Sequence, residues 1–317
     1  MTRKFDLGLI STTPLHGRPS LVFESMVGRP VSHRRTVTGL LNGMPRALAA
    51  HSLRRLAREI VAARRAGLHV IFGLGGHVVK SGCAPYITKM LEFGYVSAIA
   101  MPGSTAIHDS ELLLSGRTSE DVSERLGKGA YGVTDDTGML FARAALLSKE
   151  CGCGLGAAVG MILNDRCGHL RQAKESLLAT AQSYRAPATI HGAIGTDTIH
   201  VHPSFDAESY GRATHDDFLL FIETLKTAAV YVNVGSAVIL PEVLLKAYTA
   251  LANTEKLPED GLFTANMDML GHYRPQQNVL TRPARASVDL RGHHEIMLPL
   301  LFCALEAEQA GELEHDE

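Results

Sequence analysis

Apolar residues recur along the chain with two alternating spacings, one typical of helices and one typical of short buried strands. Residues 47–67 place Leu53, Leu56 and Ile60 near one face of a helix. The following run, residues 69–72, is apolar and rich in β-formers, and it ends in consecutive glycines. A helix, a strand and a glycine turn therefore follow one another near the start of the ordered pattern.

The same alternation continues towards the C-terminus. We predict strands at residues 69–72, 96–101, 188–194, 230–234 and 263–269, and helices at 47–67, 78–93, 136–149, 170–183, 215–227, 241–253 and 294–308. Strands that alternate with helices indicate an α/β fold. The pattern predicts a Rossmann-like, mostly parallel sheet with helices on both faces.

The pattern also divides the chain. Residues 1–46 carry many Gly, Pro and Arg residues and have weak periodicity, which favours an irregular N-terminal arm. Residues 47–310 contain no linker-like stretch and are predicted to form a single α/β domain. The acidic residues 311–317 are predicted to be a frayed tail.

Composition restricts the partners. The chain of 317 residues has 31 Lys and Arg against 33 Asp and Glu, so no basic excess favours nucleic acid as a partner. Five cysteines are an odd number and do not resemble a disulfide framework, which favours a reducing, cytoplasmic setting. No apolar run has the length of a signal peptide or a membrane span, so no membrane association is expected.

Ligands of an open parallel sheet bind beyond the carboxyl ends of its strands, so the residues that follow each strand are the candidates for chemistry. Gly75 and Gly76 follow the first predicted strand. Glycine lets the backbone approach a phosphate, although a tight turn needs glycine equally. Gly235 and Ser236 follow a later strand and offer the same two interpretations.

Acid–base candidates follow the second strand. His108 stands beside Asp109, which predicts a histidine oriented by a carboxylate for general acid or base catalysis. Capping is the alternative, because Ser104 or Thr105 suits a helix N-cap and Asp109 suits a first turn.

The segment after the third strand is the most polar of all. Asp197 suits the hydroxyls of a ribose or a cationic group. His200 and His202 alternate, so an extended chain places them on the same side, where they are candidate acid–base groups. With His191 they form an alternative zinc set, and purely structural histidines are the third interpretation.

Several of these segments are similar to those of the deoxyhypusine synthase family, in particular to its divergent bacterial members. The matching stretches are Val70 to Pro85 with Gly75-Gly76 and Cys83-Ala84-Pro85, His108-Asp109-Ser110-Glu111 with Thr118-Ser119-Glu120-Asp121, Pro187 to Asp197, Val234 to Ala250 with Leu244-Leu245-Lys246, and Gly292 to Leu301 with Pro299-Leu300-Leu301. The resemblance runs from about residue 53 to residue 305.

This resemblance implies an NAD-binding, Rossmann-like domain that forms homotetramers with sites shared between subunits. It further implies polyamine chemistry, in which spermidine is oxidised and its aminobutyl group is trapped on a lysine as an imine. It places around the NAD cofactor Gly75, Gly76, Asp197, Gly235, Ser236 and His293.

Two departures concern the transfer half of that reaction. The family's imine-forming lysine lies in a Trp-Gly-Lys tripeptide, whereas this chain has no Trp and no Lys after Lys256. The corresponding stretch contains Arg282, whose guanidinium is a poor nucleophile. The family's catalytic histidine is Ala247 here. Deoxyhypusine synthesis itself is therefore not expected.

The sequence thus predicts an NAD-dependent enzyme, a transferase or an oxidoreductase, acting on an amine, a polyamine or an amino-acid-like molecule. The candidate catalytic residues are His108, Asp109, His200 and His202. Two alternatives remain: a metal-dependent hydrolase that uses His191, His200 and His202, and a nucleotide-binding protein without catalytic activity.

Overall fold

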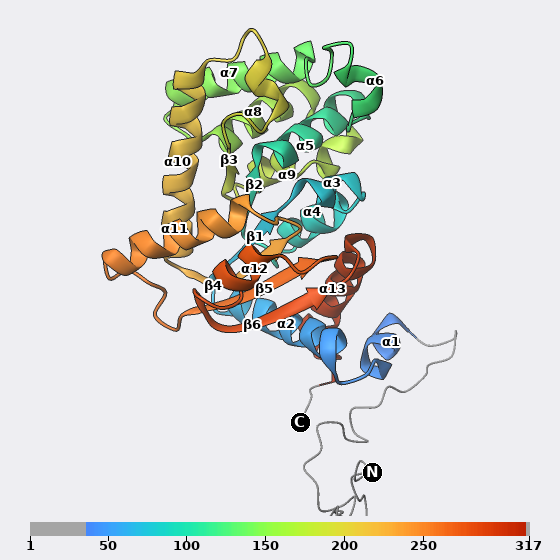
Figure 1. Ribbon diagram of the computed structural model, residues 1–317. Helices are drawn as coiled ribbons and strands as arrows, with labels where there is room; N and C mark the ends of the chain where they lie inside the picture. Colours follow the sequence, from blue (N-terminus) through green and yellow to red (C-terminus); the bar gives the residue numbers. More distant parts are fainter. Residues whose placement is uncertain (1–35, 315–317) are drawn as a thin grey trace, which may run out of the picture.

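A sheet of six parallel strands forms the centre of the protein, as seen in a computed structural model that describes residues 36–314 (Figure 1). The strands are β1 (His69–Leu74), β2 (Ala98–Pro102), β3 (Ala188–His191), β4 (Ala228–Val234), β5 (Leu262–Asp268) and β6 (Ala284–Arg291). Their order is β3-β2-β1-β4-β5-β6, and every neighbouring pair is parallel. This is the strand order of a doubly wound Rossmann-like sheet, so the predicted fold class is confirmed.

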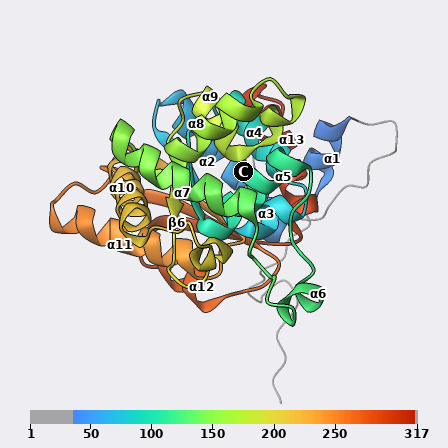
Figure 2. The same ribbon diagram turned by 90° about the horizontal axis from the view of Figure 1, so that it is seen from above.

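Helices cover both faces of the sheet because its strands are apolar on both sides. In β1, Val70 and Phe72 face one cluster of buried side chains, and Ile71 faces the other. The first face packs against α2 (Leu48–Arg65), α4 (Ala84–Glu92), α5 (Gly103–Ser115), α8 (Leu155–Cys167), α9 (Leu177–Ser183) and α13 (His294–Gln309). The second packs against α10 (Ala207–Leu225), α11 (Ile239–Asn253) and α12 (Tyr273–Asn278). Figure 2 shows these two groups on opposite sides.

Some predicted helices are divided or displaced in the structure. The helix predicted at residues 78–93 is two short helices, α3 (Gly76–Lys80) and α4. Gly82 has a φ of +73° between them, and Pro85 lies in the first turn of α4, so the chain turns there. The remaining elements are α6 (Val122–Leu126), α7 (Asp135–Cys151), the 3₁₀ helices η4 (Arg171–Glu175) and η5 (Thr198–Val201), and α1 (Val37–Gly43).

The sixth strand was not predicted. Residues 284–291 alternate between small or apolar and polar side chains (Ala-Arg-Ala-Ser-Val-Asp-Leu-Arg), which suits a half-exposed strand at the edge of a sheet. A search for long apolar runs misses such a strand because only one of its faces is buried.

Both ends of the described chain are more ordered than predicted. Residues 1–35 of the predicted irregular arm lie outside the described residues, but residues 37–43 form α1, whose first turn is capped by Thr36. Residues 312–314 of the predicted frayed tail pack against α1. Asn42 Nδ2 donates to the Glu312 carbonyl at 2.9 Å, and Leu313 is buried. Only residues 315–317 of that tail lie outside the description.

Within residues 36–314, no single helix is both long enough and apolar enough to cross a membrane. The pair α7 and α8 meets these criteria only when taken together, and it is bent by 110° at its junction. All five cysteines lie in this part of the chain as free thiols.

Candidate functional site

The carboxyl ends of β1 and β4 lie side by side in the middle of the sheet. From β1 the chain continues to β2 on one side, whereas β4 starts the other half of the sheet. Ligands of open parallel sheets bind in the crevice at such a switch point. The turns that follow β1 to β4 therefore define the candidate site.

Two glycine turns pack against each other at this switch point. A Cβ atom on Gly75 would collide with the carbonyl group of Gly235, so position 75 accepts only glycine. Gly235 has a φ of +68°, in the left-handed region that favours glycine. Gly76 differs, because a Cβ there would make only an ordinary contact, 3.4 Å from His108 Cδ2. The protein's own packing thus explains Gly75 and Gly235, while Gly76 borders the side occupied by His108.

Ser236 and His293, both predicted to contact a cofactor, have local structural roles. Ser236 Oγ accepts a hydrogen bond from Leu240 N at 3.2 Å in the first turn of α11. His293 is the N-cap residue of α13, and its exposed ring lies 3.7 Å from Glu295 Oε1. Their contacts with a cofactor stay predictions.

The buried histidine of this segment is the next residue, His294, whereas the family resemblance had pointed to His293. Its Nε2 atom lies 3.2 Å from the Met267 carbonyl oxygen, and its ring faces Gly235. Its ring centroid lies 5.5 Å from that of His77. Burial lowers the pKa of His294. Neighbouring positions at a helix start point in different directions, and the sequence alone did not reveal which of the two histidines faces inward.

Asp109 does not orient His108, contrary to the prediction. Its carboxylate is buried and accepts hydrogen bonds from Leu177 N at 2.7 Å, Leu178 N at 3.0 Å and Ser176 Oγ at 2.8 Å. Adjacent residues of a helix do not face the same way, so Asp109 points to the start of α9 while His108 points elsewhere. Asp109 is thus a helix-capping residue that acts from a different helix.

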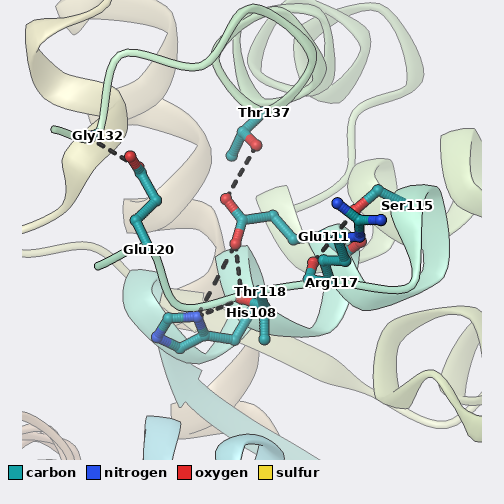
Figure 3. A network of polar contacts seen from close by, with 8 residues as sticks. All are labelled: His108, Glu111, Ser115, Arg117, Thr118, Glu120, Gly132 and Thr137. Atoms are coloured by element: carbon teal, nitrogen blue, oxygen red, sulfur yellow. Dashed lines mark hydrogen bonds and ion pairs between the residues drawn. The ribbon is translucent and has the colours of Figure 1, made fainter. Parts of the chain in front are cut away.

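His108 is instead held by Thr118 and Glu111, as Figure 3 shows. Its Nδ1 atom lies 2.7 Å from Thr118 Oγ1, and that hydroxyl donates to Glu111 Oε2 at 2.6 Å. The other carboxylate oxygen of Glu111 accepts from Thr137 Oγ1 at 3.1 Å. Burial, and then the charge of Lys80, lower the pKa of His108 to about 4, so its imidazole is neutral at neutral pH.

The loop that carries Thr118 is fixed on both sides. Ser119 has a φ of 66°, an uncommon conformation for a residue other than glycine. Glu120 accepts hydrogen bonds from Gly132 N at 2.9 Å and from Arg125 Nε at 3.0 Å (Figure 3 shows the first of these). The loop therefore presents Thr118 to His108 in a defined position.

A cavity of about 210 Å³ lies beside His108. It is lined by Lys80, Ser104, Ile107, His108, Glu111, Ser119, Glu120, Val122, Tyr131, Thr196, Asp197 and Thr198. The loop after β3 thus meets the start of α5, as the parallel order of β2 and β3 requires. His108 and Asp197, which were predicted independently, line the same cavity.

Asp197 is buried against the start of α5. A Cβ on Gly103 would collide with its carboxylate, so a glycine at position 103 lets the two segments approach. Within residues 36–314, Asp197 Oδ2 has no hydrogen-bond partner. Burial raises the pKa of Asp197 to about 6, against the opposing effect of backbone N–H groups of Ala193 and Ser104. This oxygen is buried against Gly103, and the Asp197 side chain also caps η5 by accepting from the backbone N–H of His200.

His200 and His202 do not share one side of an extended chain, because residues 198–201 form the 3₁₀ helix η5. His200 Nδ1 accepts from Gly195 N at 3.1 Å and from Asp197 N at 3.3 Å. His202 Nδ1 lies 2.7 Å from Ser204 Oγ, and the ring packs on Gly138 of α7. Both rings thus hold the loop in place, and a catalytic role for either stays a prediction.

The alternative zinc set is not assembled. His191 is buried, with Nε2 2.9 Å from Thr189 Oγ1 and its ring edge-on to Phe221. His200 and His202 have the different neighbours given above. Within the part of the chain that the structure describes, no group of three His, Cys, Asp or Glu residues is placed to hold a metal ion.

No protein-family profile and no curated protein sequence matches the chain. Solved structures do share its fold. AgrE in complex with ornithine and NAD⁺ superposes with a TM-score of 0.53 at 16% identity, over 89% of this chain and 34% of AgrE. A LOR/SDH protein from Methanococcus maripaludis S2 gives a TM-score of 0.53 at 17% identity, over 91% of this chain and 74% of that one.

A protein of Entamoeba histolytica assigned as a deoxyhypusine synthase gives a TM-score of 0.50 at 12% identity, over 82% of this chain and 88% of that one. The family resemblance predicted from the sequence therefore has a structural counterpart at the level of the fold. The chain spans about a third of the length of AgrE. These neighbours share a Rossmann-like α/β fold with this chain.

Proposed function

We propose that this protein is an NAD-dependent enzyme that oxidises a small amine, with basic amino acids as the leading class of substrate. The observation that carries the proposal is the cavity between α5 and the loop after β3, at the carboxyl-end edge of the sheet. There Asp197, one oxygen of which is buried without a partner within the described chain, and His108, whose imidazole is neutral, line one space.

The residues at this edge suit a dinucleotide. Gly76 leaves the side facing His108 and Ser104 free of a side chain, and Asp197 offers an acceptor for ribose hydroxyls. The packed turns of Gly75 and Gly235 bring two backbone segments together at the same edge. When bound there, NAD⁺ supplies the acceptor for the hydride that leaves the substrate carbon.

The charges around the cavity favour a substrate that carries an ammonium group. Glu111, Glu120 and Asp197 contribute carboxylates, against the single lysine of this lining, Lys80. Lys80 is also suited to pair with a substrate carboxylate, which an amino acid has and a polyamine lacks. The AgrE structure that shares the fold contains ornithine together with NAD⁺, so ornithine is the first compound to test.

Deoxyhypusine synthesis is not part of this proposal. The sequence lacks the Trp-Gly-Lys tripeptide of that family and has Arg282 in the corresponding stretch. We therefore infer chemistry that ends at an oxidised or rearranged small molecule, without a covalent lysine intermediate. Borohydride added together with NAD⁺ and spermidine is expected to leave no adduct, and an adduct on Lys80 would contradict this inference.

The first test is thermal unfolding with and without NAD⁺, with zinc determined on the same protein. A ligand that binds only the folded state stabilises it by about 2.7 kcal/mol at 100 times its dissociation constant, which is a readily measured shift. We expect a clear shift and no stoichiometric zinc. NADH formation is then followed by absorbance with ornithine, lysine, arginine and spermidine in turn.

Two results would contradict the proposal. The absence of any shift with millimolar NAD⁺ would show that the glycine turns serve packing alone. NAD⁺ binding without NADH formation from any of these amines would favour a nucleotide-binding protein without this activity.

A further inference from the structure

The hydrogen bonds around His108 determine which of its ring nitrogens carries the proton. Thr118 has one hydroxyl hydrogen, and the carboxylate of Glu111, 2.6 Å away, is an acceptor only. That hydrogen therefore points to Glu111, and the Thr118 oxygen must accept from His108 Nδ1 at 2.7 Å. Neutral His108 is consequently protonated at Nδ1, and Nε2 carries the free lone pair.

The free nitrogen faces the candidate site. Figure 3 shows Nδ1 directed to Glu111 and Thr118, with the second ring nitrogen pointing away from them. A Cβ built on Gly76 would lie 3.9 Å from His108 Nε2, so this nitrogen faces the end of β1. The side chain of His108 is 15% exposed, which leaves it accessible from the cavity.

We propose that Glu111, Thr118 and His108 form a relay in which Nε2 of His108 is a general base, and Thr118 and Glu111 are positioning residues. The identity of the proton donor rests on the function proposed above. When Nε2 gains a proton, Nδ1–H continues to donate to Thr118, and the Glu111 carboxylate, 4.0 Å from Nδ1, stabilises the resulting positive charge.

The proton step balances with amine oxidation. An ammonium group must first lose one proton, which His108 Nε2 accepts. The nitrogen lone pair that is freed then forms a C=N bond as the adjacent carbon gives up a hydride to NAD⁺. The products are an iminium ion, NADH and protonated His108.

The neighbours of His108 keep its imidazole unprotonated at Nε2 near neutral pH. The titratable groups that line its cavity are Lys80 on α3, Glu111 on α5, Glu120 and Tyr131 in the following loop, and Asp197 after β3. Burial and Lys80 keep the imidazole neutral, as its lowered pKa indicates. A cationic substrate has the same effect, whereas Glu111 favours the protonated state through Thr118.

The protonation state can be tested without any substrate. Nitrogen-15 NMR of the histidine rings is expected to show His108 as the Nδ1–H tautomer at pH 7. Thr118→Val removes the acceptor and is expected to lower the population of this tautomer, while Thr118→Ser retains it. Ser115→Ala is the matched control, because the Ser115 hydroxyl donates to the backbone carbonyls of Glu111 and Arg117 and to no side chain. An Nε2–H tautomer in the unmodified protein would overturn the relay, whatever the activity of the enzyme.

Kinetics test the catalytic part. His108→Asn is expected to lower kcat about 100-fold or more, the usual contribution of a general base. Thr118→Val is expected to lower kcat and to shift the acidic limb of the pH profile, with recovery in Thr118→Ser. Equal kinetics and pH profiles for Thr118→Val and Ser115→Ala would overturn the positioning role. A failure of the unmodified enzyme to oxidise any amine would contradict the proposed function, and the tautomer would then decide the relay.

Discussion

Two buried aspartates of this protein are similar in burial and pKa, but their carboxylate oxygens differ in the hydrogen bonds that they accept. Asp109, on α5, and Asp197, after β3, are both nearly inaccessible to solvent, and burial raises the pKa of each to about 6. Asp109 lies at the N-terminal end of α9, a helix other than its own, whereas Asp197 caps its own helix η5 and packs against the start of α5. By burial, charge and pKa they are hardly distinguishable.

The hydrogen bonds separate them. Asp109 accepts from two backbone N–H groups and from the Ser176 hydroxyl, so both of its oxygens are used by the protein. Asp197 keeps one oxygen, buried against Gly103, that no described residue satisfies, and the residue lines a cavity with His108. A perturbed pKa therefore identifies a buried carboxylate, and the remaining hydrogen-bonding capacity indicates whether it serves structure or a ligand.

The largest expected effect is on stability at Asp109. Asp109→Ala leaves the first N–H groups of α9 and the Ser176 hydroxyl buried without their acceptor. We expect a loss of about 3 kcal/mol in the free energy of unfolding, measured by urea denaturation. Asp206→Ala is the matched control, because Asp206 caps α10 at an exposed site, where the loss of the cap is expected to cost less stability. Equal losses in the free energy of unfolding would show that the buried cap Asp109 stabilises the protein no more than an exposed cap does.

The next effect separates binding from stability at Asp197. Asp197→Asn keeps the shape of the side chain and removes its charge. We expect the dissociation constant for NAD⁺ to rise about 10- to 100-fold, as the loss of a hydrogen bond to a charged group predicts. The free energy of unfolding is expected to change by less than about 1 kcal/mol, because a buried charge is removed along with its interactions. Both quantities are measured by calorimetry and urea denaturation.

Asp206→Asn is again the matched control, now for binding, since it changes the same atoms at a residue that does not line the cavity. Unchanged NAD⁺ affinity in Asp197→Asn, or a large loss of stability, would place Asp197 with Asp109 as a structural residue.

The sequence predicted the sheet because five of its strands are short apolar runs followed by glycine or polar residues. The same logic located Gly75, His108, Asp197 and Gly235 at one edge, since the carboxyl ends of parallel strands share an edge. The assignment of partners was less successful. Asp109 was paired with His108 because the two are adjacent, but helix geometry directs them to different neighbours.

In the structure the partners of His108 are Glu111 and Thr118, and the sequence indicates the first of them better than the second. Glu111 follows by three residues on the same helix, a spacing that does bring side chains together. Thr118 comes from a loop whose path depends on Ser119 and on the contacts of Glu120, and nothing in the local sequence specifies that path. Likewise, the 3₁₀ turn at residues 198–201 separates His200 from His202, where an extended chain was assumed.

The smallest expected effect is a pH dependence that both aspartates share. Their folded-state pKa of about 6 exceeds the ordinary value of 3.8, so between about pH 4 and pH 6 the folded state holds more protons than the unfolded chain. The stability contributed by each protonated carboxyl is complete below about pH 4 and is lost as the pH rises through 6. His108 opposes this trend in the whole protein, because its lowered pKa makes stability fall as the pH drops below 6.5.

The effect is therefore measured as a difference. The stability of the unmodified protein relative to Asp109→Asn is expected to increase as the pH falls from 7 to 5, because asparagine does not titrate. Asp197→Asn is expected to give the same sign, since burial raises both pKa values. Saturating NAD⁺ sharpens the comparison. A ligand that binds ionised Asp197 lowers its pKa and removes the pH dependence of that difference, while the dependence due to Asp109 persists. Loss of both dependences on binding, or of neither, would contradict the separation of the two carboxylates into a helix cap and a ligand acceptor.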